Sequence, residues 1–338
     1  MRETTWLAAD APTIKGMAED LLEDNSKAPI RISVKGIRPA NIYVYTVNDS
    51  YRRYLMRNFS TQIESNGVRR ASLYYCPVSI DRMSRYGWNI SSLMTPSLGF
   101  YDSEAAVALM CGLDEYGLLK SAVVGLHTRF LFADGYRPIH GAVISLDGRG
   151  IVIVGHHGAG KSTALLNLAS RLKGYPGLRV LTDDWSVASE SNDGSIEVYS
   201  MERRMSLSTL LSDENPEMNL NRLFYSHREY GIDKVWADID DVLWKGAYAA
   251  QAKLSEILVF TPDINSALIS DISAEEVTRL LVDSAYHMPD ENVEVVKVMH
   301  EFWHKHLKNH RCLCINNRHD LRKKDDIYST IINYLKRC

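Results

Sequence analysis

The chain has 338 residues, of which 45% are hydrophobic and 24% are charged, and its formal net charge is −3 at pH 7. This length is enough for two hydrophobic cores, and the small negative charge argues against a surface built to bind nucleic acid or an anionic membrane. No apolar run approaches the roughly 18 residues that cross a bilayer, and the first residues lack the apolar core of a signal peptide, so we expect a cytoplasmic protein.

Cysteine usage fits the same compartment. The number of cysteines is odd and they are spread over a long chain, which indicates reduced thiols rather than a disulfide framework. Two of them lie in an apolar run that predicts a buried strand better than a metal site. The cysteines are Cys76, Cys111, Cys312, Cys314 and Cys338, and the apolar run is 312–315.

Residues 1–133 are expected to form an N-terminal α+β domain. Apolar residues that alternate predict strands there, and apolar residues at helical spacing predict helices. No pattern in this part indicates chemistry, so substrate selection, oligomerisation and packing all stay open as its role. The expected elements are a helix at 17–22, strands at 30–34 and 41–46, a helix at 51–63, a strand at 72–76 and one long or two shorter helices within 104–132.

A turn signal at 134–138 marks the expected start of a second domain, residues 134–338. Tight turns at 147–150 and 192–194 predict hairpins, so the sheet should be mixed rather than purely parallel. A capping box at 273–276 should open a helix that ends near residue 286. Residues 207–232 are read either as a mobile lid or as a helical surface segment. The further expected strands are 142–146, 151–154, 179–182, 186–200 as a hairpin, 256–260 and 313–315, and the further helices are 163–172, 292–307 and 327–335.

The segment from Gly155 to Ser162 matches the pattern Gly-x-x-x-x-Gly-Lys-Ser between an apolar strand and a helix. Glycines let successive backbone N–H groups point at phosphate oxygens, and the following helix adds its positive N-terminal end. We therefore expect a nucleoside triphosphate, with Lys161 at the β- and γ-phosphates and the Ser162 hydroxyl on Mg²⁺. The residues expected to contact the nucleotide are Gly155, His157, Gly158, Ala159, Gly160, Lys161, Ser162 and Thr163.

Asp183 and Asp184 follow the apolar run 180–181, at the carboxyl end of a strand, where α/β sheets bind ligands. Neighbouring side chains on a strand point to opposite sides, so one acid can hold a metal while the other faces a substrate if the strand ends there. A helix cap or turn acid is the alternative. Downstream of a phosphate loop, we favour the role in metal binding.

Three features carry a resemblance to the HPr kinase/phosphorylase family, whose nucleotide-binding core is shared with phosphoenolpyruvate carboxykinase. They are His140 followed by Gly141, the loop that begins at Gly155, and the acid pair Asp183 and Asp184. The resemblance covers about residues 137–204 and implies an α/β fold, in which a P-loop-containing mixed sheet is flanked by helices. It also implies that Asp183 is the general base, that Asp184 and Ser162 hold Mg²⁺, and that His140 supports the phosphates or the base.

The chain departs from this family after the acid pair. The family has a Glu-x-Arg-Gly segment there, and this sequence has Glu202-Arg203-Arg204 with no glycine following. The departure leaves the acceptor of the phosphate open. A phosphoryl group in transfer still needs a cation, which Arg203 or Arg204 can supply, and we count Arg204 among the expected catalytic residues.

Together these patterns predict a kinase that uses ATP and Mg²⁺ to phosphorylate an aliphatic hydroxyl, with a serine of a protein or peptide as the leading acceptor. A small-molecule hydroxyl is the first alternative. The second is a nucleotide-gated regulatory protein, which would lack the base or a metal ligand, whereas both are expected here. The family resemblance is compatible with a homo-oligomer. The acceptor, the choice between ATP and GTP, and reversibility of the transfer are not readable from the sequence.

Overall fold

The chain divides into two compact units, each with a sheet of its own. The first unit comprises Met1–Gly135, Arg228–Ile232 and Tyr286–Val295, and the second comprises Tyr136–His227, Asp233–Ala285 and Val296–Cys338. Within the residues described, no helix combines the length and the apolar character that crossing a membrane requires. The computed structural model describes residues 5–22, 29–34, 40–46, 49–58, 69–77, 97–112, 116–156, 158–208, 226–229, 232–261, 268–285, 293–316 and 324–336.

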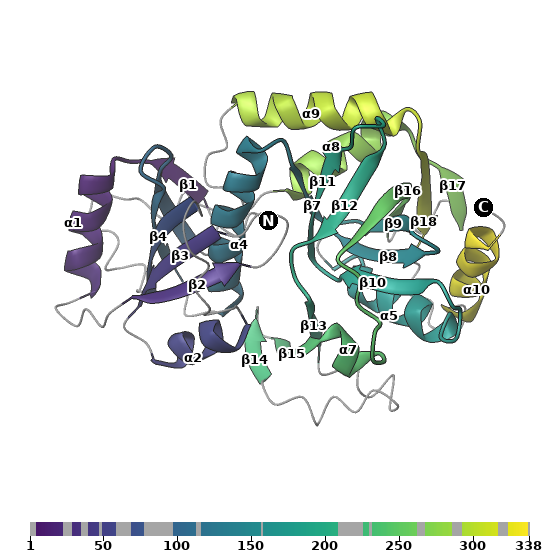
Figure 1. Ribbon diagram of the computed structural model, residues 1–338, viewed down its shortest axis with the longest axis horizontal. Helices are drawn as coiled ribbons and strands as arrows, with labels where there is room; N and C mark the ends of the chain where they lie inside the picture. The colour runs from purple at the N-terminus through teal and green to yellow at the C-terminus, as the bar shows by residue number, and fades with distance from the viewer. Residues whose placement is uncertain are drawn as a thin grey trace. The chain divides into compact units, whose positions relative to one another are not determined.

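The first unit is built on a six-stranded sheet with the strand order β1-β5-β6-β4-β3-β2. β3, β4 and β6 are parallel, whereas β2 and β5 run antiparallel to their neighbours β3 and β6. Helix α1 packs on β4, β5 and β6, and helix α4 packs on β3 and β4 from the other face (Figure 1). The elements are β1 Thr5–Ala8, α1 Ala11–Leu22, β2 Ile30–Val34, β3 Ala40–Tyr45, α2 Asp49–Asn58, β4 Arg69–Pro77, β5 Ser97–Asp102, β6 Val107–Gly112 and α4 Tyr116–Ala133.

The prediction of helix within 104–132 is wrong for the first part of that range, where β6 forms. This strand lies between β4 and β5, and its residues from Val107 to Cys111 are all buried. Alanine, leucine and methionine are good helix formers, but this preference amounts to less than about 1 kcal/mol per residue, and backbone pairing on both sides of a buried strand outweighs it. The later of the two shorter helices forms as α4. The predicted helix at 51–63 forms as α2 up to Asn58, and residues 59–63 lie outside the described residues.

The second unit is built on a nine-stranded sheet whose main path has the order β10-β8-β9-β16-β12-β11-β7, with β17 and β18 beside it. β16 runs parallel to β9 and to β18, and the other pairs along the path are antiparallel, which confirms the predicted mixed sheet. Its strands are β7 Arg137–His140, β8 Ala142–Leu146, β9 Arg149–Val154, β10 Leu178–Thr182, β11 Trp185–Glu190, β12 Ile196–Ser200, β16 Gln251–Thr261, β17 Ile269–Asp271 and β18 Arg311–Asn316.

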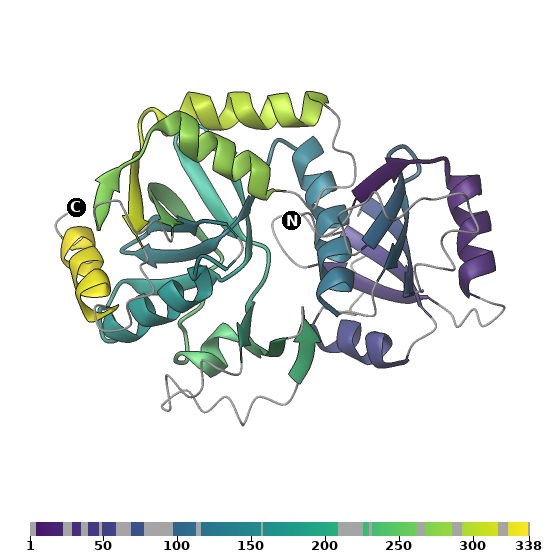
Figure 2. The same cartoon turned by 180° about the vertical axis from the view of Figure 1, so that it is seen from behind.

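Helices cover both faces of this sheet. Along β9, Ile151 and Ile153 pack in the cluster that holds α5 (Lys161–Arg171) and α10 (Lys324–Leu335). The alternate residues Val152 and Val154 pack instead with α8 (Ala274–Ser284) and α9 (Val293–Leu307). Figure 2 shows the two helix pairs on opposite faces. The apolar run of β9 thus reflects burial on both sides, as in other helix-covered sheets.

The sheet also folds back on itself. β7 and β8 are five positions apart along the path, which corresponds to about 24 Å in a flat sheet, at about 4.8 Å per strand. Only Gly141 connects them in sequence. Since the two steps from His140 to Ala142 span at most about 7 Å, the two parts of the sheet must curl until the end of β7 meets the start of β8. This curl brings together segments that a flat sheet would separate.

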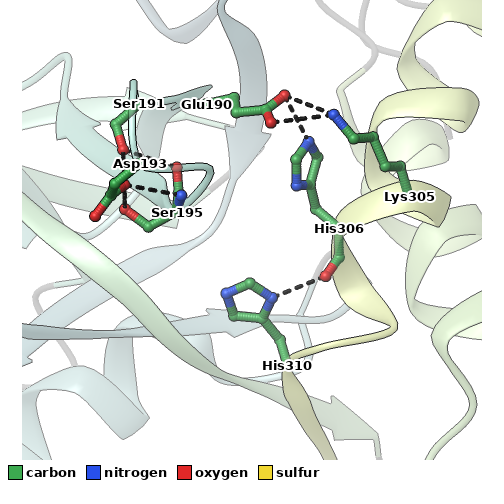
Figure 3. Close-up of polar contacts among 7 residues, drawn as sticks. All are labelled: Glu190, Ser191, Asp193, Ser195, Lys305, His306 and His310. Atoms are coloured by element: carbon green, nitrogen blue, oxygen red, sulfur yellow. Dashed lines mark hydrogen bonds and ion pairs between the residues drawn. The ribbon is translucent and has the colours of Figure 1, made fainter.

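Local sequence signals account for several element ends. Ser273 accepts a hydrogen bond from the Glu276 backbone and Glu276 caps Ser273 in return, as predicted for the start of α8. The predicted turn between β11 and β12 also forms, and Asp193 accepts hydrogen bonds there from Ser191 and Ser195 (Figure 3). Cys312 and Cys314 lie on β18, as the apolar run predicted. No cysteine in the described ranges forms a disulfide, and Cys338 lies outside these ranges.

Residues 207–232 contain strands where they are described. A small sheet has the order β13-β15-β14, so the prediction of a helical surface segment is not met in these strands. Residues 209–225, which held most of the predicted lid or helix, lie outside the described residues. The elements are β13 Arg204–Ser208, β14 Ser226–Glu229, β15 Ile232–Asp238 and the short helix α7 Ile239–Val242.

Candidate functional site

The three sequence features lie at one edge of the second sheet. β8 is antiparallel to both of its neighbours, so β9 and β10 run in the same direction and end at the same edge. β8 begins at that edge, directly after Gly141, and β16 and β18 also end there. Because only β8 separates β9 from β10, their ends lie about 10 Å apart. The glycine-rich loop after β9, the acid pair after β10 and the His-Gly element before β8 are thereby gathered in one place (Figure 1).

The glycine-rich loop, residues 155–162, connects β9 to α5. A Cβ atom on Gly155 would lie 2.5 Å from the carbonyl oxygen of Phe260, so the close approach of β16 requires glycine at this position. Gly158 and Gly160 have φ angles of 77° and 83°, in the left-handed region that glycine adopts without strain. Ala159 N–H closes a turn on the His156 carbonyl at 3.0 Å. His157, predicted to contact the nucleotide, lies outside the described residues.

The start of α5 is arranged to accept an anion. Its N-cap residue is Gly160, no side chain caps the helix, and no acidic residue occupies its first turn. The first N–H groups of such a helix have no acceptor within the helix itself, and the helix dipole adds positive potential there. Ser162 and Thr163 follow in this first turn, half-buried. Phosphate groups bind at helix ends of this kind.

Lys161 folds back over the loop. Its Nζ donates to the carbonyl oxygens of Gly155 at 3.1 Å and of His156 at 3.4 Å. The ammonium group therefore lies beside the carbonyl groups of the first two residues of the loop. A lysine at this position is a candidate cation for an anionic ligand.

The acid pair follows β10 and its two side chains have different environments. Asp183 is 3% exposed, and its Oδ2 accepts a hydrogen bond from the Ser206 backbone at 3.0 Å. Asp184 is half-buried, and its carbonyl oxygen accepts from the Gly141 N–H at 2.8 Å. This division agrees with the prediction that neighbouring acids at a strand end face different surroundings.

His140 contacts the acid pair through Asp184. Its Nε2 lies 3.0 Å from Asp184 Oδ1, and its ring stacks on Trp185 with 4.9 Å between the centroids. Gly141 follows because a Cβ atom there would lie 2.6 Å from the carbonyl oxygen of Ile153. The His-Gly element thus has a structural reason for each residue: the histidine reaches the acid and the glycine lets β8 start against β9.

The two arginines predicted as cations have different positions. Arg203 donates to Asp238 and to Asp240 at 2.8 Å each, and its guanidinium lies 5.0 Å from the centre of the Tyr248 ring. The hydrogen bond to Asp238 is the largest cause that raises the pKa of Arg203. Arg204 begins β13, two residues before Ser206, so both side chains lie on the same face of that strand. Two acids already neutralise Arg203.

Ser162 and Asp184 are the residues that could hold Mg²⁺. Across the described ranges, no group of three His, Cys, Asp or Glu side chains is arranged as a metal site. The chemistry of Mg²⁺ fits this, because the ion keeps several waters and is bound by one or two protein oxygens together with phosphate oxygens. A hydroxyl from Ser162 and a carboxylate from Asp184 are the candidates for such protein oxygens at this sheet edge.

Sequence reasoning missed three contributors to this edge: Ser206, Trp185 and Phe260. Trp185 could have been found, because it directly follows the acid pair. Ser206 and Phe260 act through backbone atoms, which residue type does not reveal. Comparison with protein-family models gives no match for this chain, and a search among curated proteins gives no significant match.

Proposed function

We propose that the protein is an ATP-dependent kinase of the HPr kinase/phosphorylase type, which transfers the γ-phosphate to an aliphatic hydroxyl. The observation that supports this is the meeting of a glycine-rich loop and an acid pair at one sheet edge. The loop fits the tail of a triphosphate, with backbone N–H groups from 155–163 around the phosphates. The acid pair fits the cation and the proton that phosphoryl transfer requires.

In this proposal each residue has one task. Lys161 neutralises the β- and γ-phosphates, and Arg204 adds positive charge on the γ-phosphoryl group. Asp183 takes the proton of the attacking hydroxyl. The oxygen of that hydroxyl forms the new bond to the γ-phosphorus while the bond from this phosphorus to the β-phosphate oxygen breaks. Asp184 and Ser162 are the ligands for Mg²⁺, and His140 orients Asp184. Mg²⁺ supplies charge neutralisation between the β- and γ-phosphates when it is bound.

The proposed acceptor is a serine of a protein or peptide, and the family resemblance supports this choice. The departure at Glu202-Arg203-Arg204 leaves the identity of that protein open. Incubation of the purified protein with γ-labelled ATP, Mg²⁺ and a cell lysate, followed by mass spectrometry of phosphorylated polypeptides, tests the acceptor class. A labelled small molecule without any labelled polypeptide would favour the small-molecule kinase instead.

Nucleotide binding is tested first and separately. Calorimetry with ATP and Mg²⁺ should give a stoichiometric complex for the wild-type protein and a much weaker one for Lys161→Ala, because the lysine charge is removed. Binding without transfer to any acceptor would support a nucleotide-gated regulator. Failure to bind any nucleoside triphosphate would overturn the proposal as a whole.

A further inference from the structure

Strand β13 uses its outer edge to contact the acid pair. β13 pairs with β15 so that Met205 lies opposite Ala237, and Ser206 lies opposite Trp236. In an antiparallel pair the backbone groups of alternate residues point toward the partner and away from it. Ser206 is a residue whose N–H points away, since it donates to Asp183 at 3.0 Å. β13 is also an edge strand of its sheet, so no further strand competes for this N–H.

Arg203 fixes the end of this strand. Its Nε and Nη2 donate to Asp238, the last residue of β15, and to Asp240, in α7. Its backbone carbonyl also accepts from the Ile239 N–H at 3.1 Å. Asp240 in turn accepts from the Tyr248 N–H at 2.9 Å. A bidentate arginine held in this way has little freedom, so the start of β13 is fixed relative to β15.

We propose that the backbone N–H of Ser206 is a positioning group for the carboxylate of Asp183, and that Arg203 holds the strand that presents it. The catalytic consequence rests on the proposed function, in which Asp183 is the general base. A base must lie within hydrogen-bond reach of the proton that it takes, and a misplacement of about 1 Å costs up to about 100-fold in rate. The buried carboxylate of Asp183 is oriented by contacts of this kind.

Ser206→Pro tests the backbone contact directly. Proline removes the N–H, and an edge strand tolerates it at a position whose N–H is outside the ladder. The matched control is Ser206→Ala, which keeps the N–H and removes only the hydroxyl that accepts from Trp236 Nε1 at 3.0 Å. We expect kcat to fall about tenfold or more in Ser206→Pro and to stay within about twofold in Ser206→Ala, with KM for ATP unchanged in both. Equal kcat values for the two variants would overturn the proposal.

Arg203→Ala should have the same signature, a lower kcat with unchanged KM for ATP, because β13 loses its attachment to Asp238 and Asp240. The control is Arg179→Ala on β10, because this exposed arginine donates to the carbonyl oxygens of Pro176 and Leu178 in its own stretch of chain. Arg203→Lys should recover only part of the activity, because lysine cannot bind both carboxylates in the same planar arrangement. A normal kcat in Arg203→Ala would contradict the role of Arg203.

Hydrogen exchange of the Ser206 amide tests whether this amide donates to Asp183, and it does so without an activity measurement. This amide should exchange slowly in the wild-type protein and in Asp183→Asn, whose side-chain oxygen still accepts a hydrogen bond. It should exchange at least about tenfold faster in Asp183→Ala, which has no acceptor. Equal exchange in all three proteins would overturn the proposal. If the wild-type protein transfers no phosphate, the proposed function fails, and the exchange result still decides whether Ser206 holds Asp183.

Discussion

The imidazole of His140 lies between Asp184 and Trp185, with Nε2 3.0 Å from the carboxylate oxygen and the ring stacked on the indole. In the proposed function this contact orients Asp184 as a ligand for Mg²⁺. His140 and Asp184 are 44 positions apart in the sequence, and the orientation of each side chain depends on the other.

His140→Ala should weaken the activation of the protein by Mg²⁺. Loss of a group that orients a metal ligand costs about 10-fold to 100-fold in metal affinity. The measurement is the Mg²⁺ concentration that gives half-maximal transfer at saturating ATP. His300→Ala, which changes a half-buried histidine on α9, is the control and should behave like the wild-type protein. An unchanged Mg²⁺ requirement in His140→Ala would mean that His140 does not orient a metal ligand.

Lys161→Ala and Asp183→Asn should separate binding from transfer. Removal of the lysine charge should weaken ATP binding and lower transfer by at least about 100-fold. Asp183→Asn keeps the size of the side chain but cannot take a proton, so transfer should fall at least about 100-fold while the Kd for ATP stays within about threefold. Calorimetry and single-turnover transfer measure the two effects. Near-normal turnover in Asp183→Asn would remove Asp183 as the base.

Two glycine substitutions in the loop should lower the free energy of unfolding by different amounts. Gly155→Ala places a Cβ atom 2.5 Å from the Phe260 carbonyl oxygen, so the backbone must shift, and we expect a loss of about 1–3 kcal/mol of unfolding free energy with loss of ATP binding. Gly158→Ala meets no atom within 4 Å but must hold a φ angle of 77°, which costs about 1–2 kcal/mol. Urea denaturation measures both. A larger loss in Gly158→Ala would contradict the close contact at Gly155.

Stability should fall as the pH is lowered from 7 to 5, because of His306 on α9. Burial is the largest cause that lowers the pKa of His306, while the nearby Glu190 acts to raise it (Figure 3). The unfolded chain therefore binds this proton more readily, and folding loses free energy as the pH falls below about 6.5. His306→Gln should flatten this part of the profile in urea titrations at each pH. His304→Gln, on the exposed side of α9, should leave it unchanged.

Below pH 5, protonation of Glu190 should lower the stability of the fold further. The hydrogen bond from Lys305 is the largest cause that lowers the pKa of Glu190 from its usual 4.5. A carboxyl group whose pKa is lowered in the folded state stabilises the fold when the pH is above the pKa of the unfolded chain. That stabilisation is lost as the pH falls through and below 4.5. Glu190→Gln should remove this second phase and deepen the first, because Glu190 no longer acts to raise the pKa of His306. A profile that keeps the second phase would contradict the assignment.

Local patterns in the sequence determined several elements of the second unit. The apolar runs of β9, β10 and β18, the turn at 192–194 and the capping box at Ser273 depend on neighbours in the chain, and all of them form as predicted. The loop 155–162 and the acid pair were also readable, because their residue types and spacing are local. The mixed order of strands followed from the predicted hairpins.

The tertiary structure alone decided which of these parts meet. The helix-forming residues of β6 become a strand because two neighbouring strands pair with it, and no local pattern shows those neighbours. The contact of His140 with Asp184 requires the sheet to curl, and the hydrogen bond from Ser206 to Asp183 uses a backbone atom that every residue except proline has. Such contacts depend on strand direction and register over long separations, which is why side-chain patterns along the chain do not contain them.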